Sequence, residues 1–314
     1  MTFSTALEVV DGVDLAGKTC VITGASAGMG RESARALAAA GAHIVLAARD
    51  AEALAATQEW IGTEVPGART TTVALDLTSL ANVRVAAAAI GDIAPRIHVL
   101  MNNAGVMFTP FGRTADGFEI QAGTNHLGHF ELTRLLVPQL SAAEGARIVI
   151  LSSDGHYMSD VDLGDINWHK REYDKFLAYG ASKTANILHM VELDRRLRER
   201  GVRAYAVHPG MVATQLARHM TAEDLTTLRG YLPRRAKRSE SDTRPKTNSG
   251  PRIAMPDQGA VTQVWAAVSP ELSDTGSVYL ANCGIRSDPA PYTLDEDRAA
   301  ALWEVSEKLC GGEG

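Results

Sequence analysis

The stretch "TCVITGASAGMGRESARALAAAGA" covers residues 19–42 and decides the fold. It opens with a short apolar run typical of a buried strand and closes with a helical pattern that ends at Gly41. Between them, Gly24, Gly28 and Gly30 form a turn. Glycine allows a sharp turn and lets a phosphate approach the free N–H groups of a helix N-terminus. The stretch therefore predicts a nucleotide-binding strand–turn–helix unit, with a plain tight junction as the alternative.

The rest of the chain repeats this alternation of apolar runs and helical segments. Further strands are expected at 43–48, 70–76, 97–105, 146–153, 203–210 and 276–281, and helices at 30–42, 50–62, 79–92, 117–142 and 176–200. Such alternation predicts parallel strands joined by right-handed crossovers. We expect one α/β domain over residues 1–314, a Rossmann-type doubly wound parallel sheet of about seven strands with helices on both faces. Ligands of such sheets bind beyond the carboxyl ends of the strands.

Two polar, irregular segments interrupt this rhythm, at 154–178 and 215–256. We expect both to shape a substrate pocket. The second contains a basic insertion at 233–252, which includes the run "RRAKR". That run matches a nucleic-acid patch in composition, but a solvated loop is the interpretation we favour.

Composition excludes several classes of function. The formal net charge is -6 and the pI about 5.9, which argues against nucleic acid as a partner. Three widely spaced cysteines predict neither a disulfide framework nor a metal site. The first residues lack the pattern of a signal peptide, and no stretch reaches the roughly 20 apolar residues of a membrane span. A cytoplasmic protein is expected.

Several side chains just after strands suit a nucleotide. Arg49 follows the second strand, where an acid would bind the ribose of NAD and an arginine meets the 2′-phosphate of NADP. An ion pair with Asp50 or Glu52 is the alternative. Asp76 suits an adenine amino group or a helix cap. The run "NNAG", residues 102–105, suits close approach of a ribose, or forms a plain turn.

The run "YGASK" places Tyr179 one helical turn before Lys183. A surface helix explains such a pair, but so does a phenol that gives up its proton. The pKa of tyrosine is ordinarily about 10, too high for a base at neutral pH, and a nearby ammonium lowers it. Ser152 and Ser153 end the neighbouring strand, where a hydroxyl would hold a substrate oxygen. They lack the Gly-x-Ser-x-Gly turn of an acyl-transfer serine, which disfavours a hydrolase.

Together these motifs resemble the short-chain dehydrogenases/reductases. The resemblance rests on "TGASAGMG", "DLT" at 76–78, "NNAG", "TNHLGHF" at 124–130, "ILSS" at 150–153, "YGASK" and "HPGMVAT" at 208–214. It implies four catalytic residues: Ser152 to polarise the substrate oxygen, Tyr179 as acid/base, Lys183 to lower the pKa of Tyr179, and Asn125 to support a proton-relay water. The implied cofactor-binding residues are Gly24, Ser26, Ala27, Gly28, Met29, Gly30, Arg49, Asp76, Leu77, Asn103, Ala104, Gly105, Tyr179, Lys183, Pro209, Val212 and Thr214.

Within that family the chain looks most like the branch of retinol dehydrogenases and WW-domain oxidoreductases. The resemblance implies an NADP(H)-dependent enzyme that interconverts a small-molecule alcohol and a carbonyl, with a lipophilic substrate. The alternative is a nucleotide-binding regulator without turnover. Met107, Phe108, His156, Tyr157, Trp168 and Met211 are candidate pocket residues, each open to ordinary packing. The family commonly pairs through its long helices, so a homodimer or homotetramer is possible.

Overall fold

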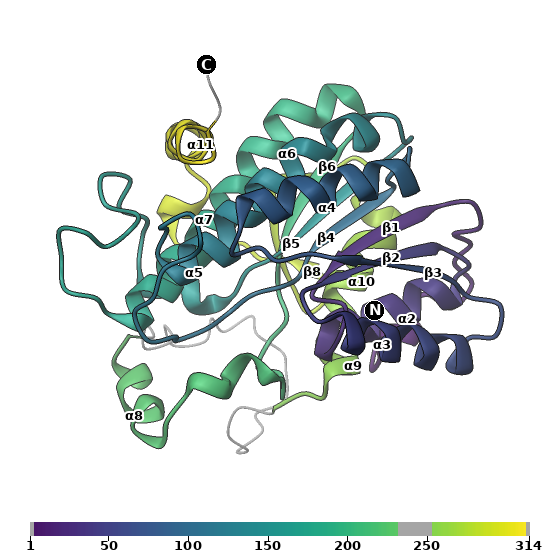
Figure 1. Cartoon of the computed structure of the whole chain (residues 1–314), viewed down its shortest axis with the longest axis horizontal. Coiled ribbons are helices and arrows are strands. Elements are labelled where there is room, and N and C mark those ends of the chain that lie inside the picture. Colours follow the sequence, from purple (N-terminus) through teal and green to yellow (C-terminus); the bar gives the residue numbers. More distant parts are fainter. Residues whose placement is uncertain (1–2, 232–252, 312–314) are drawn as a thin grey trace.

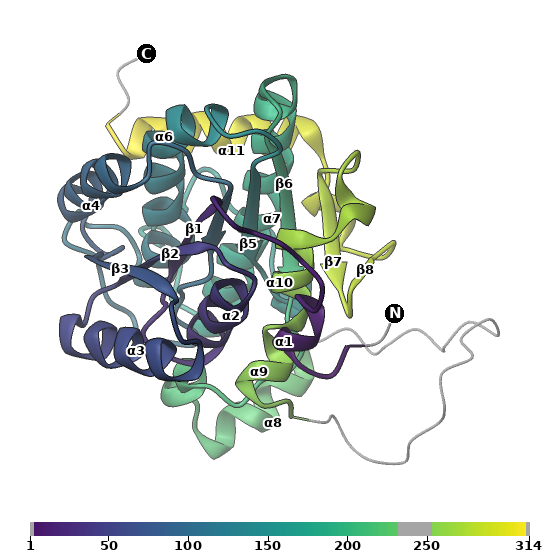
Figure 2. The same ribbon diagram turned by 90° about the vertical axis from the view of Figure 1, so that its right-hand side faces the viewer.

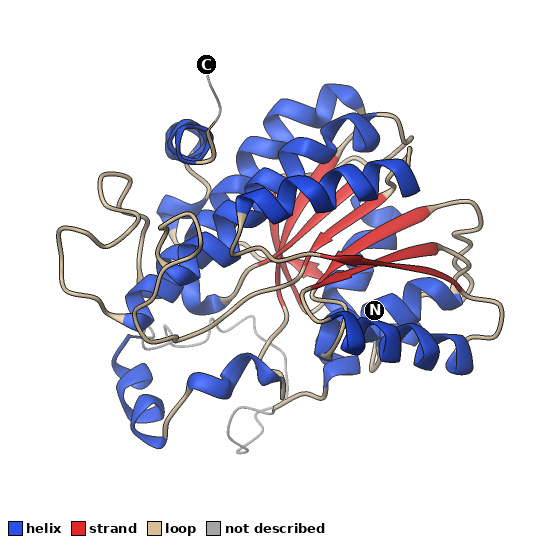
Figure 3. Ribbon diagram, viewed as in Figure 1, coloured by secondary structure: helices blue, strands red, loops and turns tan. Residues whose placement is uncertain are grey.

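One sheet of eight strands forms the centre of the protein (Figures 1 and 3). The structure is a computed structural model that describes residues 3–231 and 253–311. The sheet order is β3-β2-β1-β4-β5-β6-β7-β8, and every pairing is parallel except that of β7 with β8. The strands are β1 (Thr19–Thr23), β2 (His43–Ala48), β3 (Arg69–Ala74), β4 (Val99–Asn102), β5 (Arg147–Leu151), β6 (Arg203–His208), β7 (Val278–Ala281) and β8 (Gly284–Ile285). The predicted Rossmann-type sheet is confirmed, with the two-residue β8 added to the expected seven.

Helices cover both faces of this sheet, as Figures 1 and 2 show. The α-helices are α1 (Ala6–Val9), α2 (Gly28–Ala39), α3 (Ala51–Glu64), α4 (Leu80–Ile93), α5 (Ile120–Ala122), α6 (Gly128–Ser141), α7 (Lys175–Leu197), α8 (Ala222–Tyr231), α9 (Pro256–Gly259), α10 (Val261–Val268) and α11 (Glu296–Leu309). One apolar core lies between the sheet and α4, α6, α7 and α11. A second lies on the opposite face, against α1, α2, α3 and α10.

Alternation along the strands divides their side chains between the two cores. In β1, Val21 belongs to the first core, while Cys20 and Ile22 belong to the second. In β5, Ile148 and Ile150 face α7, and Val149 faces the other side. Successive strand residues point to opposite faces, so a strand covered on both sides is apolar throughout.

Side-chain caps fix where several helices begin. The carboxylate of Asp50 accepts from the N–H of Ala53 at the start of α3, and Ser79 caps α4 in the same way. Asp174 accepts from two N–H groups at the start of α7. These bonds satisfy N–H donors that the first turn of each helix leaves unpaired. The cap at Asp174 also fixes the residue at which α7, the helix that carries Tyr179, begins.

The strand order reverses beside β1, which pairs with β2 on one side and β4 on the other. A crevice for ligands forms at the carboxyl ends of the strands at such a reversal. The turns after β1 and β4 therefore mark the expected site. Two of the candidate cofactor residues, Tyr179 and Lys183, lie on α7. All the others lie in or beside a segment that directly follows a strand.

The structure differs from the sequence-based expectation in three places. The helix expected at 117–142 is divided into α5, a π-helical segment η1 (Gly123–Leu127) and α6. The segment 215–256 is less irregular than expected, because it contains the 3-10 segment η4 (Gln215–His219), α8 and the start of α9. The basic run at 234–238 lies outside the described residues.

The C-terminal helix α11 was not expected, and it packs across α6 and α7 (Figure 2). Trp303 of α11 meets Phe130 of α6 edge to face, with ring centroids 4.8 Å apart. Residues 178–194 of α7 are all buried within the chain. This stretch of α7 is therefore unavailable to the predicted homodimer or homotetramer. Among the described residues, no helix is both long and apolar enough to span a membrane.

Candidate active site

The turn between β1 and α2 has the geometry of a phosphate cradle. Gly24 and Gly28 have φ values of 66° and 56°, in the left-handed region that favours glycine. A methyl group on Gly30 would lie 2.4 Å from the carbonyl oxygen of Gly24, so only glycine fits there. Ala27 precedes α2 and provides no side-chain cap, so the first N–H groups of α2 remain open to an anion. These residues, with Ser26 and Met29 between them, fit the diphosphate of a dinucleotide.

The turn after β4 is bound tightly to the turn after β1. The side-chain amide of Asn103 donates to the carbonyl oxygen of Thr23 at 2.8 Å. The hydroxyl of Thr23 accepts from the N–H groups of Asn103 and Ala104 at 2.9 and 3.0 Å. A methyl group on Gly105 would lie 3.0 Å from Oδ1 of Asn125 and 3.8 Å from Nζ of Lys183. The small residues of this turn let it lie against both the cradle and α7.

The candidate adenosine contacts lie at the ends of β2 and β3. Arg49 is exposed directly after β2, and the neighbouring Asp50 caps α3. The carboxylate of Asp76 accepts from the N–H and the hydroxyl of Thr78, at 2.9 and 2.7 Å. Asp76 thus stabilises its own turn, while Ser79 caps α4. Leu77 is buried.

The segment after β6 lies over the cradle. Pro209 is half-buried beyond the end of β6. Val212 forms a parallel bridge with Ala254. Thr214 accepts from the N–H of Leu216 as a helix cap, and a methyl group on Gly28 would lie 3.4 Å from Cγ2 of Thr214. Thr214 therefore combines the capping role with a place beside the glycine-rich turn.

Tyr179 lies in the first turns of α7 and is buried, and the hydroxyl of Ser153 lies close enough to its phenol to lower the pKa of that phenol. The Ser153 hydroxyl accepts from the N–H of Gly155 at 3.0 Å, which fixes its position. A tyrosine and a serine hydroxyl beside one another form a site where both can bind a single substrate oxygen.

The role expected for Ser152 does not fit this geometry. Its hydroxyl is buried and donates to the carbonyl oxygen of Lys183 at 2.9 Å. Ser152 therefore anchors α7 to β5, and Ser153 is the serine beside Tyr179. The reason is alternation: Ser152 continues the face of Ile148 and Ile150, which packs beneath α7. The apolar pattern of the sequence does not by itself distinguish the two serines, because both follow the last residue of β5.

Lys183 is not among the groups that shift the pKa of Tyr179. Burial raises the pKa of Tyr179 to about 12, and the nearby Ser153 hydroxyl opposes this only in part. Burial lowers the pKa of Lys183 to about 7. The Lys183 ammonium lies 5.6 Å from the centroid of the Tyr179 ring and donates to the carbonyl oxygen of Leu151 at 3.0 Å. Desolvation of both groups thus outweighs their mutual attraction.

Asn125 joins the turn after β4 to α7 from its place in η1. Its side chain accepts from the N–H of Val106 at 2.8 Å and donates to the carbonyl oxygen of the same residue at 3.0 Å. It also donates to the hydroxyl of Ser182 at 2.9 Å. π-turns are frequent at functional sites, and the structure brings Asn125 to the same turn as Lys183.

Comparison with known proteins identifies this arrangement. The family model described as short chain dehydrogenase matches residues 18–225. The chain belongs to the short-chain dehydrogenase/reductase family. It is 39% identical over 301 residues to human retinol dehydrogenase 13, covering 95% of this chain and 86% of that protein. It is 37% identical over 315 residues to the WW domain-containing oxidoreductase of Pongo abelii, covering 98% and 71%. The predicted branch is confirmed.

Solved structures agree with the fold of this short-chain dehydrogenase. The crystal structure of an uncharacterized protein from Mycobacterium paratuberculosis has a TM-score of 0.73 and 33% identity, covering 100% of this chain and 99% of that one. The RhlG/NADP complex of Pseudomonas aeruginosa has a TM-score of 0.63 and 23% identity, covering 85% and 95%, and supports the fold alone. Members of the family bind a nicotinamide cofactor, which the cradle fits.

Apolar side chains surround Tyr179 in this member of the family. The ring of Phe108 lies 5.1 Å from that of Tyr179 and 4.7 Å from that of Phe176. Phe108 has a φ of 52°, a strained conformation for an aromatic residue, and its N–H donates to Gln121 at 2.9 Å. The other members of this apolar cluster are Met107, Met158, Met220, Leu228 and Tyr231.

Of the six candidate pocket residues, Met107 and Phe108 belong to this cluster. His156 and Tyr157 stack on one another with centroids 3.9 Å apart, on the side of β7. Trp168 packs against Tyr173. Met211 is exposed. Three members of the apolar cluster, Met220, Leu228 and Tyr231, come from the segment 215–256. The sequence predicted that this segment shapes the pocket but did not indicate which of its residues do so.

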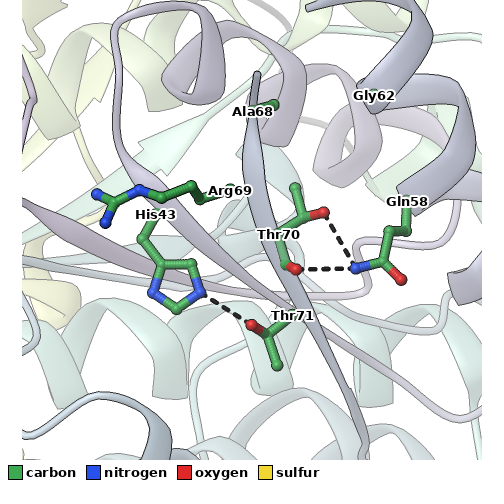
Figure 4. A pocket seen from close by; sticks show the side chains of 7 residues that line it. All are labelled: His43, Gln58, Gly62, Ala68, Arg69, Thr70 and Thr71. Carbon is green, nitrogen blue, oxygen red and sulfur yellow. Dashed lines mark hydrogen bonds between the residues drawn. The ribbon is translucent and has the colours of Figure 1, made fainter. Parts of the chain in front are cut away.

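A shallow cavity of about 510 Å³ lies elsewhere, at the outer edge of the sheet (Figure 4). It is lined by residues at the start of β2 and β3, including His43, Thr70 and Thr71, and by Gln58 of α3. His43 bonds to Thr71, and Gln58 donates to Thr70, so these polar groups already have partners. The cavity lies at the amino ends of the strands, at the opposite end of the sheet from the candidate site around Tyr179, and we assign it no role in that site.

Proposed function

We propose that this protein is an NADP(H)-dependent oxidoreductase that interconverts an alcohol and a carbonyl by hydride transfer, with Tyr179 as the acid/base. The observation that carries the proposal is the position of the buried Tyr179, with the Ser153 hydroxyl beside its phenol, Lys183 5.6 Å from its ring centroid, and the glycine cradle close to Lys183. Ser153 takes the role that the family resemblance implies for Ser152. A cytoplasmic location is part of the same proposal.

In this mechanism the nicotinamide, when bound, supplies or accepts the hydride. The hydroxyls of Ser153 and Tyr179 hold the carbonyl oxygen and stabilise its developing charge. With its pKa near 12, Tyr179 keeps its proton at neutral pH and is ready to donate it. Lys183, with a pKa near 7, exchanges protons readily at that pH. Asn125 fixes the turn beside Lys183, and oxidation of an alcohol reverses these steps.

A lipophilic secondary alcohol, ketone or aldehyde is the substrate class we infer. The residues around Tyr179 are aromatic or apolar, which suits a hydrophobic substrate. The name of the relative retinol dehydrogenase 13 supports this, because retinol is a lipophilic alcohol. We treat residues 1–314 as one domain in which segments 154–178 and 215–256 provide the pocket walls.

Arg49 is expected to set the choice of cofactor. A guanidinium directly after β2 pairs with the 2′-phosphate of NADP, which NAD lacks. Arg49→Ala should therefore weaken NADPH binding by about 10- to 100-fold and change NADH binding by less than about threefold, as expected for loss of one charge-assisted contact. Titration of both nucleotides by nicotinamide fluorescence measures this. Equal losses for NADPH and NADH would contradict the assignment.

A turnover screen tests the function itself. Wild-type protein is mixed with NADPH or NADH and a panel of ketones and aldehydes of increasing apolar size, and the oxidised cofactor with the matching alcohols. Heat-unfolded protein is the blank. We expect turnover with NADPH that improves with apolar size. Tight nucleotide binding without turnover of any member would favour the alternative, a nucleotide-binding regulator.

A further inference from the structure

His129 lies one helical turn after Asn125, in α6, and the proposed mechanism makes no use of it. Its side chain is only 1% exposed. The ring bridges two elements of the site: Nδ1 lies 3.1 Å from the main-chain oxygen of Asn125, and Nε2 lies 2.9 Å from the hydroxyl of Thr23. A buried imidazole with both nitrogens bonded is held in one orientation.

These two contacts determine the tautomer of His129. A carbonyl oxygen only accepts, so Nδ1 carries the proton. Burial and the nearby charge of Lys183 lower the pKa of His129 to about 4, so the ring is neutral at physiological pH. Nε2 then accepts from the hydroxyl of Thr23, whose other available acceptor, the carbonyl oxygen of Met101, is farther away at 3.3 Å.

On its two sides, His129 connects the cofactor cradle with the catalytic helix. The hydroxyl of Thr23 accepts from the N–H groups of the turn after β4. Asn125 donates to the hydroxyl of Ser182, which in turn donates to the carbonyl oxygen of Tyr179 at 2.8 Å. A continuous series of hydrogen bonds therefore runs from the end of β1 through His129 and Asn125 to α7.

We propose that His129 is a positioning residue: its Nδ1–H fixes the Asn125 carbonyl, and its Nε2 ties that carbonyl to the turn that holds the cofactor. This inference rests on the proposed function. The link sets the place of Asn125 relative to Lys183, because both side chains border Gly105: a methyl group there would lie 3.0 Å from Oδ1 of Asn125 and 3.8 Å from Nζ of Lys183. Loss of the link shifts Asn125 and with it the turn at Val106.

His189 provides a matched control. It is 3% exposed and its ring packs against Phe130 and Trp303, with centroids 5.3 and 5.9 Å away. A purely structural histidine at 129 would respond to substitution as His189 does. His129→Phe and His189→Phe therefore make the same chemical change at two buried sites, only one of which is bonded to Asn125.

The test measures kcat, cofactor affinity and the pH profile of kcat for His129→Phe, His129→Asn and His189→Phe. We expect His129→Phe to lower kcat by about 30- to 100-fold and to shift its pH profile, since small displacements at a reacting centre have costs of this size. His129→Asn places an amide N–H near the position of Nδ1 and should recover at least tenfold of that loss. His189→Phe should change kcat by less than about threefold. Equal kcat values for the two phenylalanine variants would overturn the proposal.

A second measurement separates this proposal from the proposed function. The N–H of Val106 donates to Asn125, so its hydrogen exchange reports the position of Asn125 without any turnover. We expect faster exchange at Val106 in His129→Phe than in His189→Phe, with protection restored in His129→Asn. If wild-type protein reduces no carbonyl, the proposed function fails, and this exchange pattern alone decides the positioning role. Unchanged exchange at Val106 would refute it.

Discussion

Tyr179→Phe is expected to lower kcat by about 10³- to 10⁴-fold. Substitutions of the two adjacent serines, Ser152 and Ser153, are expected to differ in how far they lower kcat. Ser153→Ala should lower kcat by about 10²- to 10³-fold, because its hydroxyl lies beside the Tyr179 phenol and would hold the substrate oxygen together with it. Ser152→Ala should lower kcat by less than about tenfold, because its hydroxyl is bonded to the main chain of Lys183. Steady-state kinetics at saturating cofactor measures all three.

Stability and binding controls make this comparison specific. Phenylalanine preserves the packing of residue 179 against Phe108, and each serine variant loses one hydrogen bond, worth about 1 kcal/mol. Thermal unfolding and nicotinamide titration should therefore differ little among the variants. A larger kcat loss in Ser152→Ala than in Ser153→Ala would return the catalytic role to Ser152 and contradict the geometry described here.

The serine pair shows where reasoning from the sequence reached its limit. The pattern of apolar runs predicted β5 and its place beside α7, because buried parallel strands have a distinct composition. It did not indicate which face of β5 each terminal residue joins. That depends on the register with β4 and β6 and on the packing of α7, which places Ser152 beneath the helix.

The electrostatics of Tyr179 had a similar limit. The spacing to Lys183 predicted a shared helix face, and the structure has both side chains on that face. The pKa values depend on desolvation, however, and burial of α7 on all sides follows from α11 and the segments around it. The order of strands, the glycine turn and the turn after β4 were predictable because each depends on local backbone geometry. The helices α8 and α11 were missed because tertiary contacts define them.

Acidification from pH 7 to pH 5 is expected to lower the free energy of unfolding by about 5 kcal/mol, through three buried histidines. His126, His129 and His189 are at most 3% exposed. Burial lowers the pKa of His126 to about 3 and that of His129 to about 4, and holds that of His189 well below 6.5. His126 and His129 therefore remain neutral in the folded chain at pH 5, and burial of His189 opposes its protonation in the same direction.

The sign follows from proton linkage. The unfolded chain has histidine pKa values near 6.5, so below that pH it binds more protons than the folded chain, and stability falls. Each histidine contributes a slope of up to about 1.4 kcal/mol per pH unit until its folded pKa is reached. Glu119 acts in the opposite direction, because burial raises its pKa and protonation then favours the folded state. With total stabilities of about 5–15 kcal/mol, the histidine effect is large enough to unfold the chain near pH 5.

Urea unfolding followed by tryptophan fluorescence at several pH values between 7 and 5 measures the slope. His126→Gln keeps an amide donor near Nε2, which bonds the hydroxyl of Ser306 at 2.8 Å, and removes one titrating group. Its pH slope, averaged between pH 7 and 5, should be shallower by about 1 kcal/mol per pH unit. Parallel curves for wild type and His126→Gln would show that acid destabilisation arises elsewhere, because a buried neutral histidine that protonates only on unfolding contributes to the slope.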